Sequence, residues 1–175
     1  TVCLWSSSDD GGEDRRFMAV KYGQKQGRER RCSKFEMRYS HAKGNVFFVG
    51  GNCQHHYPKT TKGEDEDEWV HRCLTYDGES LASYRNGILE GSYEAELETS
   101  GPSEMLFGAY NKEATAYRWR GKLDDVSVLK EALSEKDVEE LYRKTKGGGS
   151  SAMELTNELE FKFRNKEQRV HRGQD

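Results

Sequence analysis

Five consecutive acidic residues, Glu64 to Glu68, form the densest group of potentially catalytic side chains in the sequence. Paired carboxylates can hydrolyse glycosidic bonds, one acting as acid and the other as base or nucleophile. Clustered carboxylates can also hold hard cations. This run lies within a long polar stretch, residues 54–68, with no apolar neighbours to hold its side chains in a cleft. We expect a solvated acidic loop, with binding of a metal or of a basic partner as the alternatives.

A second group of potential ligands contains Cys53, His55 and His56, which His41 could approach across a predicted hairpin. Zinc sites usually show paired spacing such as C-x-x-C, which this group lacks, so we expect a polar loop. No cysteine and histidine have a spacing that indicates a nucleophile and its base. The sequence therefore predicts a protein that is not an enzyme and that requires no cofactor.

The composition limits the other classes of function. The 175 residues are 33% hydrophobic and 34% charged, with a net charge of -3, which predicts one domain with a lean core and an appendage. A negative net charge does not attract nucleic acid. The basic loop at Arg28, Arg30 and Arg31 lacks the interleaved aromatic residues that a nucleic-acid site would be expected to have. No apolar run approaches the ~18 residues of a membrane-spanning helix. We expect neither a nucleic-acid partner nor a membrane span.

Short alternating segments separated by turns predict about nine β-strands. The expected strands cover residues 1–5, 16–23, 32–40, 45–53, 69–76, 81–87, 88–97, 105–110 and 121–130, with loops at 6–14 and 54–68. Asp77-Gly78 and Asn86-Gly87 are the strongest hairpin turns. Such spacing favours an all-β fold, an antiparallel β-sandwich.

Residues 32–40 and 45–53 are predicted to form a hairpin in which the numbers of facing residues add up to 85, so that Met37 faces Phe48. One face of this hairpin is apolar and aromatic. The opposite face carries Lys34, Glu36 and Arg38. The same register places Cys32 opposite Cys53, which predicts a cross-strand disulfide.

One helix is expected within residues 132–145. Ser134 is its predicted N-cap, and Asp137 occupies the capping-box position. Val138, Leu141 and Tyr142 form its apolar stripe.

Five motifs in order resemble the laminin G-like, concanavalin A-like jelly-roll family. They are "WVHRCLTYDG" at 69–78, "YRNG" at 84–87, "MLFGAY" at 105–110, "WRGKLDDVSV" at 119–128 and "ALSEKDVEELY" at 132–142. "TVCLW" also resembles an early strand of the family, which usually has one or two strands before it. The resemblance covers Thr1 to about Arg143 and implies a jelly-roll sandwich.

The resemblance also implies candidate ligand sites. Calcium is the cofactor most often implied, and oxygen-bearing side chains near the rim loops are its candidates. They are Asp77, Asn111 and Asp124, with Asn86 as a further one. The laminarinase-type members of the family carry an E-x-D-x-E strand motif, and the acidic run of this chain does not contain it.

A sugar site, also implied by the resemblance, needs an exposed aromatic platform with polar groups. The candidate residues lie in or near loops: Tyr57, Tyr110, Tyr117 and Trp119. Trp119 also matches a family aromatic that packs inward, so a place in the core is its alternative.

Cys3 and Cys73 fall where the family carries small residues, and we interpret them as buried thiols. A second disulfide is the alternative. The even count of four cysteines fits an oxidising compartment without requiring one.

The predicted organisation is a laminin G-like domain at 1–146 and, at 147–175, a Gly/Ser linker with a charged tail. Within the tail, Leu159, Phe161 and Phe163 alternate with charged residues, which predicts one strand. Our hypothesis is that this strand docks on its own sandwich or on the sheet of a partner.

These observations predict a non-catalytic interaction module, an accessory or structural subunit that binds protein partners within a larger assembly. A carbohydrate-binding, lectin-like module is the alternative. The compartment stays open between the extracellular or cell-surface space and an organelle assembly.

Overall fold

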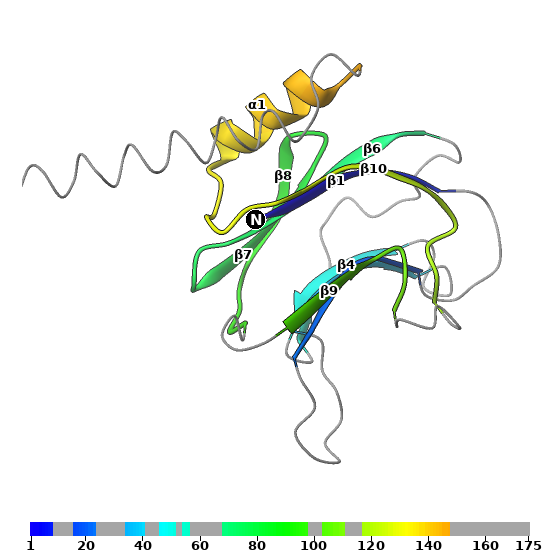
Figure 1. The fold of residues 1–175 in the computed structure, drawn as a ribbon. Helices are drawn as coiled ribbons and strands as arrows, with labels where there is room; N and C mark the ends of the chain where they lie inside the picture. Colours follow the sequence, from blue (N-terminus) through cyan, green and yellow to red (C-terminus); the bar gives the residue numbers. More distant parts are fainter. Residues whose placement is uncertain are drawn as a thin grey trace, which may run out of the picture.

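Two antiparallel sheets packed face to face, with one helix beside them, make up the described part of the chain (Figure 1). The computed structural model describes residues 1–8, 16–23, 34–40, 46–51, 54–56, 68–97, 103–110 and 117–147. Its elements are β1 (Val2–Ser8), β2 (Arg16–Gly23), β3 (Phe35–Ser40), β4 (Val46–Gly51), β5 (Gln54–His56), β6 (Val70–Tyr76), β7 (Ser80–Arg85), β8 (Ile88–Glu94), β9 (Ser103–Phe107), β10 (Gly121–Val128) and α1 (Glu135–Thr145).

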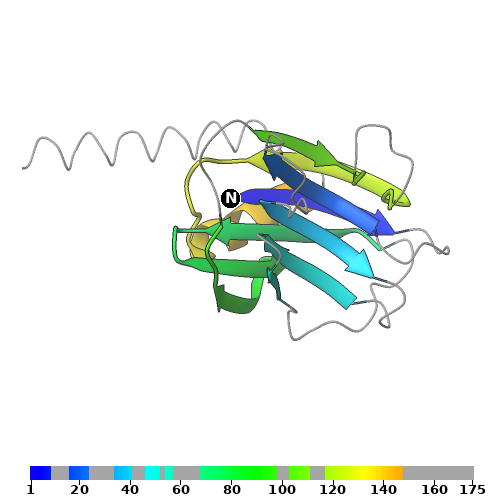
Figure 2. The same ribbon diagram turned by 90° about the horizontal axis from the view of Figure 1, so that it is seen from below.

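Each sheet contains five strands. The first has the order β10-β1-β6-β7-β8 and the second the order β5-β4-β3-β2-β9. All of these pairings are antiparallel, as the sequence predicts. The edge strands β9 and β10 lie at the same side of the sandwich (Figure 2).

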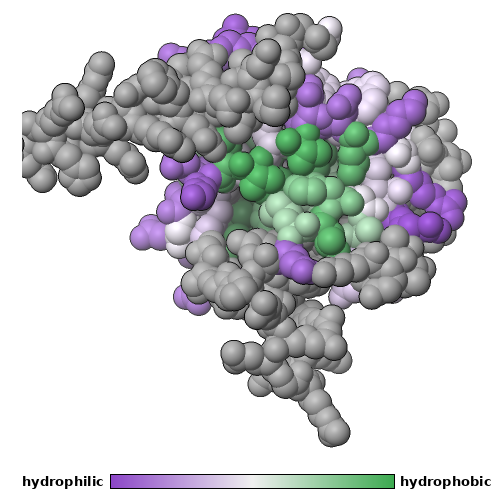
Figure 3. All heavy atoms as spheres, in the orientation of Figure 1, coloured by the Kyte–Doolittle hydropathy of each residue, from purple (hydrophilic) through white to green (hydrophobic). Residues whose placement is uncertain are grey.

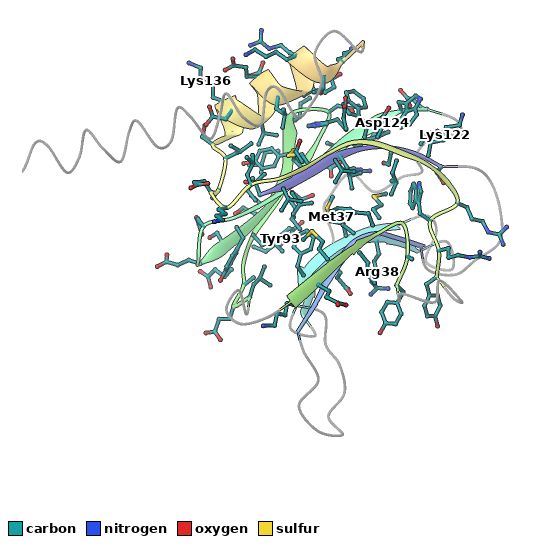
Figure 4. All side chains as sticks on the ribbon, in the orientation of Figure 1. Met37, Arg38, Tyr93, Lys122, Asp124 and Lys136 are labelled. Carbon is teal, nitrogen blue, oxygen red and sulfur yellow. A yellow bond between two sulfur atoms is a disulfide. The ribbon has the colours of Figure 1, made fainter. Side chains whose placement is uncertain are left out.

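The core fills the space between the sheets. Its buried side chains are Val2, Leu4, Met18, Ala19, Phe35, Met37, Leu74, Leu81, Ala95 and Trp119. Met37 and Tyr93 point into this space, whereas Arg38 points away from it (Figure 4). A second apolar cluster lies between the first sheet and α1, which covers the outer face of that sheet (Figure 1).

Helix α1 begins and ends where its sequence predicts. The Ser134 hydroxyl accepts a hydrogen bond from the Asp137 N–H, and the Asp137 carboxylate accepts one from the Ser134 N–H, which completes the capping box. Val138 and Leu141 are buried against the sheet, and Tyr142 is half-buried. No helix in the described ranges is both long and apolar enough to cross a bilayer.

Both predicted hairpin turns are present. Asn86 and Gly87 join β7 to β8 and have φ values of 51° and 80°. A two-residue hairpin turn of this kind requires the left-handed conformation at both positions, and asparagine and glycine tolerate it. In the β6–β7 turn, the Asp77 carboxylate accepts hydrogen bonds from the N–H groups of Glu79 and Ser80, at 2.9 and 2.7 Å.

The first three residues of each of two predicted loops are in fact in strands. β1 continues through Ser6, Ser7 and Ser8, which pair with β10 and are buried. The Ser6 hydroxyl donates to the Val70 carbonyl, and the pairing with β10 bonds the backbone of the three serines. β5 lies within the stretch predicted as a polar loop and pairs with β4. Local polarity predicts loops there, but cross-strand pairing overrides it.

The predicted register of the hairpin between β3 and β4 is wrong by one residue. Met37 faces Val49, so the numbers of facing residues add up to 86. Five residues, 41–45, separate the two strands, and an odd number places the centre on a residue instead of between two residues. The register argument for a disulfide between Cys32 and Cys53 therefore fails, and both cysteines lie outside the described residues.

Candidate functional site

Tyr110 and Tyr117 lie together at one end of the sandwich, in the segment between β9 and β10. Their ring centroids are 5.7 Å apart and their planes make an angle of 86°, an edge-to-face pair. Both side chains are half-buried. Tyr117 adopts a left-handed backbone conformation with φ 54°, which turns the chain back toward β10.

Trp119 fixes the base of this segment. Its backbone N–H donates to the Gly108 carbonyl at 2.8 Å, which joins the two ends of the segment that carries the tyrosines. Its indole N–H lies 3.2 Å from the carbonyl oxygens of Ser7 and Lys122. With 8% of its surface exposed, Trp119 packs in the core.

The four aromatic residues that the sequence nominates for sugar binding therefore divide into three groups. Tyr110 and Tyr117 are brought together, Trp119 is buried in the core, and Tyr57 lies outside the described residues. Two perpendicular phenol rings present an apolar face and two hydroxyl groups. Such a surface can stack on an apolar patch of a ligand and form hydrogen bonds at its rim.

The calcium candidates do not form one site within the described ranges. Asp77 is exposed at its turn, and the N–H groups of Ser80 and Glu79 lower the pKa of its carboxyl. Asp124 accepts a hydrogen bond from the neighbouring Asp125 N–H at 2.8 Å, and Asn86 accepts one from the His71 N–H at 2.9 Å. Asn111 lies outside the described residues. Calcium requires several converging oxygens, so these described residues do not fit it.

In the described ranges, the group of three potential metal ligands that lies close together is Cys3, His71 and Cys73. Cys3 and Cys73 are directly opposed on β1 and β6, with Cα atoms 4.1 Å apart, and form a disulfide. This finding overturns their interpretation as buried thiols. It arises because directly opposed residues on antiparallel strands come close enough to bond. Disulfide sulfurs are not the thiolates that metal ions require.

His71 lies beside this disulfide in an aromatic cluster under α1. Its ring centroid is 5.2 Å from that of Trp5 and 5.8 Å from that of Tyr142. Its Nε2 is 3.9 Å from the Cys73 sulfur, and its buried Nδ1 has no hydrogen-bond partner among the described residues. Burial lowers the pKa of His71 to about 4, so the ring is neutral at pH 7. The Trp5 indole N–H donates to the Thr145 hydroxyl at 2.9 Å, which joins this cluster to the end of α1.

Buried charges are the feature that sequence reasoning missed. Arg72 and Glu90 form an ion pair at 2.8 Å with both side chains almost fully buried. Arg72 lies on the same face of β6 as the buried Val70 and Leu74, two residues from each, and this spacing was the available signal. On the outer face of the second sheet, the charged row of Lys34, Glu36 and Arg38, which the sequence places opposite the apolar face, is also buried.

A family model and several solved structures are similar to this chain. A model of the concanavalin A-like lectin/glucanases superfamily matches residues 1–139. No curated protein sequence matches the chain closely enough to count as a relative. Among solved structures, the heptameric SAP-like pentraxin of Limulus polyphemus is similar, with 18% identity and a TM-score of 0.63, over 85% of this chain and 71% of the pentraxin chain.

Two further structures are similar at comparable identity. A putative carbohydrate binding protein of Bacteroides ovatus has 18% identity and a TM-score of 0.56, over 79% of this chain and 39% of that chain. Domain 4 of AbnA, an extracellular arabinanase of Geobacillus stearothermophilus, has 15% identity and a TM-score of 0.54, over 79% and 64%, and its structure contains arabinotriose. The chain thus spans less than two thirds of these two proteins. At such identities the likeness concerns the fold, and the match of the family over most of the chain carries the conclusion. This chain belongs to the concanavalin A-like lectin/glucanases superfamily.

Proposed function

We propose that this protein is a non-catalytic carbohydrate-binding module and that Tyr110 and Tyr117 form its sugar platform. The observation that carries the proposal is their edge-to-face pair at the end of the sandwich, with both rings half-buried. Two similar structures add support, because one is that of a putative carbohydrate binding protein and the other that of an arabinanase domain in complex with arabinotriose.

The proposed chemistry follows from the two rings. One face of a pyranose or furanose ring exposes C–H groups, which pack on an aromatic ring, while its hydroxyl groups need hydrogen-bond partners. A platform that is already held in place loses little conformational freedom on binding. The hydrogen bond between Trp119 and Gly108 provides this support, because it closes the segment that carries both tyrosines.

A non-catalytic role agrees with the surroundings of the acidic side chains in the described part of the chain. Glycoside hydrolysis needs two carboxyl groups facing each other across the scissile bond. Glu90 is buried and is already paired with Arg72. Asp77 and Asp124 accept hydrogen bonds from neighbouring backbone N–H groups.

The test is a glycan array followed by calorimetric titration of the best ligand. Tyr110→Ala and Tyr117→Ala should each weaken binding by about tenfold or more, since loss of a central aromatic contact costs more than ~1 kcal/mol. Tyr117→Phe keeps the ring and should retain most of the affinity. Glu79→Ala, in the β6–β7 turn at the opposite end of the sandwich, is the matched control. Glycan binding that survives both alanine variants would contradict the proposed platform.

A protein-binding role within a larger assembly is the second candidate. The observation that favours it is the apolar surface at the start of the edge strand β8, where Ile88 and Leu89 are exposed. The two functions separate experimentally. Tyr110→Ala should remove glycan binding and leave this surface unchanged, whereas Ile88→Asp should change the surface and leave glycan binding unchanged.

A further inference from the structure

In the described part of the chain, the sandwich is open at one side, between its edge strands β9 and β10. The two strands border the same edge in both views (Figures 1 and 2). Hydrophobic side chains gather in the middle of this side (Figure 3). We call this surface the open edge and define it by Met105, Phe107, Leu123, Val126 and Val128.

The register of β10 shows that its exposed Val128 belongs to the core face. Val128 pairs with Val2, a core residue, and Ser127 pairs with Cys3 on the outer face. Asp125 and Val126 lie at a β-bulge, where two residues of β10 stand opposite Leu4 of β1. Val126 is 40% exposed, and Val128 is 51% exposed although it faces the core side.

The opposite sheet repeats this arrangement. Phe107 on β9 pairs with Ala19, which is fully buried in the core, so Phe107 also faces inward, and it is 36% exposed. Inward-facing side chains of a sandwich are normally covered by the neighbouring strand of one sheet or the other. Among the described strands, β10 pairs only with β1, and β9 pairs only with β2. The open edge therefore has the geometry of a place for one more strand.

We propose that residues 158–164 of the same chain form this strand and pair with β10. Leu159, Phe161 and Phe163 alternate with Glu158, Glu160, Lys162 and Arg164. In a strand, this pattern puts three large apolar side chains on one face and four charged ones on the other. The apolar face covers the open edge. The charged face continues the outer surface of β10, where Lys122 and Asp124 stand (Figure 4).

The chain leaves the described fold close to this place. Thr145, in the last turn of α1, is bonded to Trp5, and Trp5 pairs with Asp124 on β10. The chain thus departs from a point one strand away from the open edge. The ten residues 148–157 can span up to ~33 Å. The eight residues of β10 extend over ~26 Å, so the tail can reach either end of β10.

The proposal is tested by amide hydrogen exchange, read by mass spectrometry on the full chain. In the unmodified protein, the amides of residues 159–163 should exchange at least ~10-fold more slowly than those of an unstructured chain. The amides of β10 that are not bonded to β1 should be protected with them. Phe161→Asp places a charge against the open edge and should remove the protection of residues 159–163 and of these β10 amides, while the amides bonded to β1 stay protected. Lys162→Asp, on the charged face of the same segment, is the matched control and should leave both protected.

Three results would overturn the proposal. The first is full exchange of residues 159–163 in the unmodified chain, because the tail would then form no strand. Protection of the outer edge of β10 in that case would mean that another segment covers it. The second is protection that accompanies a doubling of the molecular mass in light scattering, which would identify a second copy as the occupant. The third is equal protection in Phe161→Asp and the unmodified chain. Glycan binding by the Phe161→Asp variant should equal that of the unmodified chain, so this test stands apart from that of the sugar platform.

Discussion

Acidification should destabilise this protein through His71. The side chain is buried between Trp5 and Tyr142, and burial lowers its pKa from 6.5 to about 4. Between these two values the unfolded chain binds a proton that the folded protein excludes. Stability is therefore complete above pH 6.5 and falls as the pH drops toward 4.

The size of this effect follows from the two pKa values. A difference of about 2.5 units corresponds to about 3 kcal/mol when fully expressed. At pH 4.5, where the folded-state group is still mostly neutral, the loss relative to pH 7.5 is about 2.5 kcal/mol. This is a large share of the ~5–15 kcal/mol by which most domains are stable.

The assay is urea unfolding at pH 7.5 and pH 4.5, with tryptophan fluorescence as the probe. His71→Gln cannot titrate, so it should lose about 2.5 kcal/mol less than the unmodified protein on acidification. Carboxylates contribute equally to both proteins and cancel in the comparison. Val138→Ala, a cavity variant in α1, is the control, because its cost should not depend on pH. The reasoning is refuted if His71→Gln and the unmodified protein lose the same free energy.

Two further predictions concern how the helix and the disulfide hold the first sheet. Gly87→Ala should lower the free energy of unfolding by about 2–4 kcal/mol, since φ is 80° and a Cβ atom there would lie 3.0 Å from Tyr142 Cδ1. Gly78→Ala, with φ 111° and nothing within 4 Å, carries only the conformational cost and should lose less in the same urea titration. Replacing both Cys3 and Cys73 with serine opens a link across 70 residues and should cost about 2–5 kcal/mol in thermal unfolding. An unchanged unfolding temperature of the double serine variant would contradict this stabilising effect of the disulfide.

Several elements could be predicted because their information is local. The capping box of α1 needs only Ser134 and Asp137 three residues apart, and the β7–β8 turn needs only Asn86 followed by Gly87. Alternation along each strand similarly separates an apolar face from a polar one. These signals predict a sandwich with one helix, which the structure confirms.

The candidate site could be predicted only in part. The sequence nominates Tyr110 and Tyr117 by type and by their place between two strands, but their contact depends on how Trp119 and Gly108 close the segment. The strand pattern assigns Glu36 to a polar face, but in the structure its side chain is buried. Alternation separates the two faces of a strand and does not say what covers either of them.

Tertiary structure decided the remaining features because they depend on register between strands. A shift of one residue between β3 and β4 re-pairs every residue of that hairpin, and local sequence does not exclude it. The disulfide of Cys3 and Cys73 requires β1 to lie beside β6, which follows it by more than sixty residues. The open edge is likewise visible only once strand order places β9 and β10 at one side. Sequence alone determined what each segment of this protein can form, and the pairing of distant strands decided which surfaces are covered and which remain to bind.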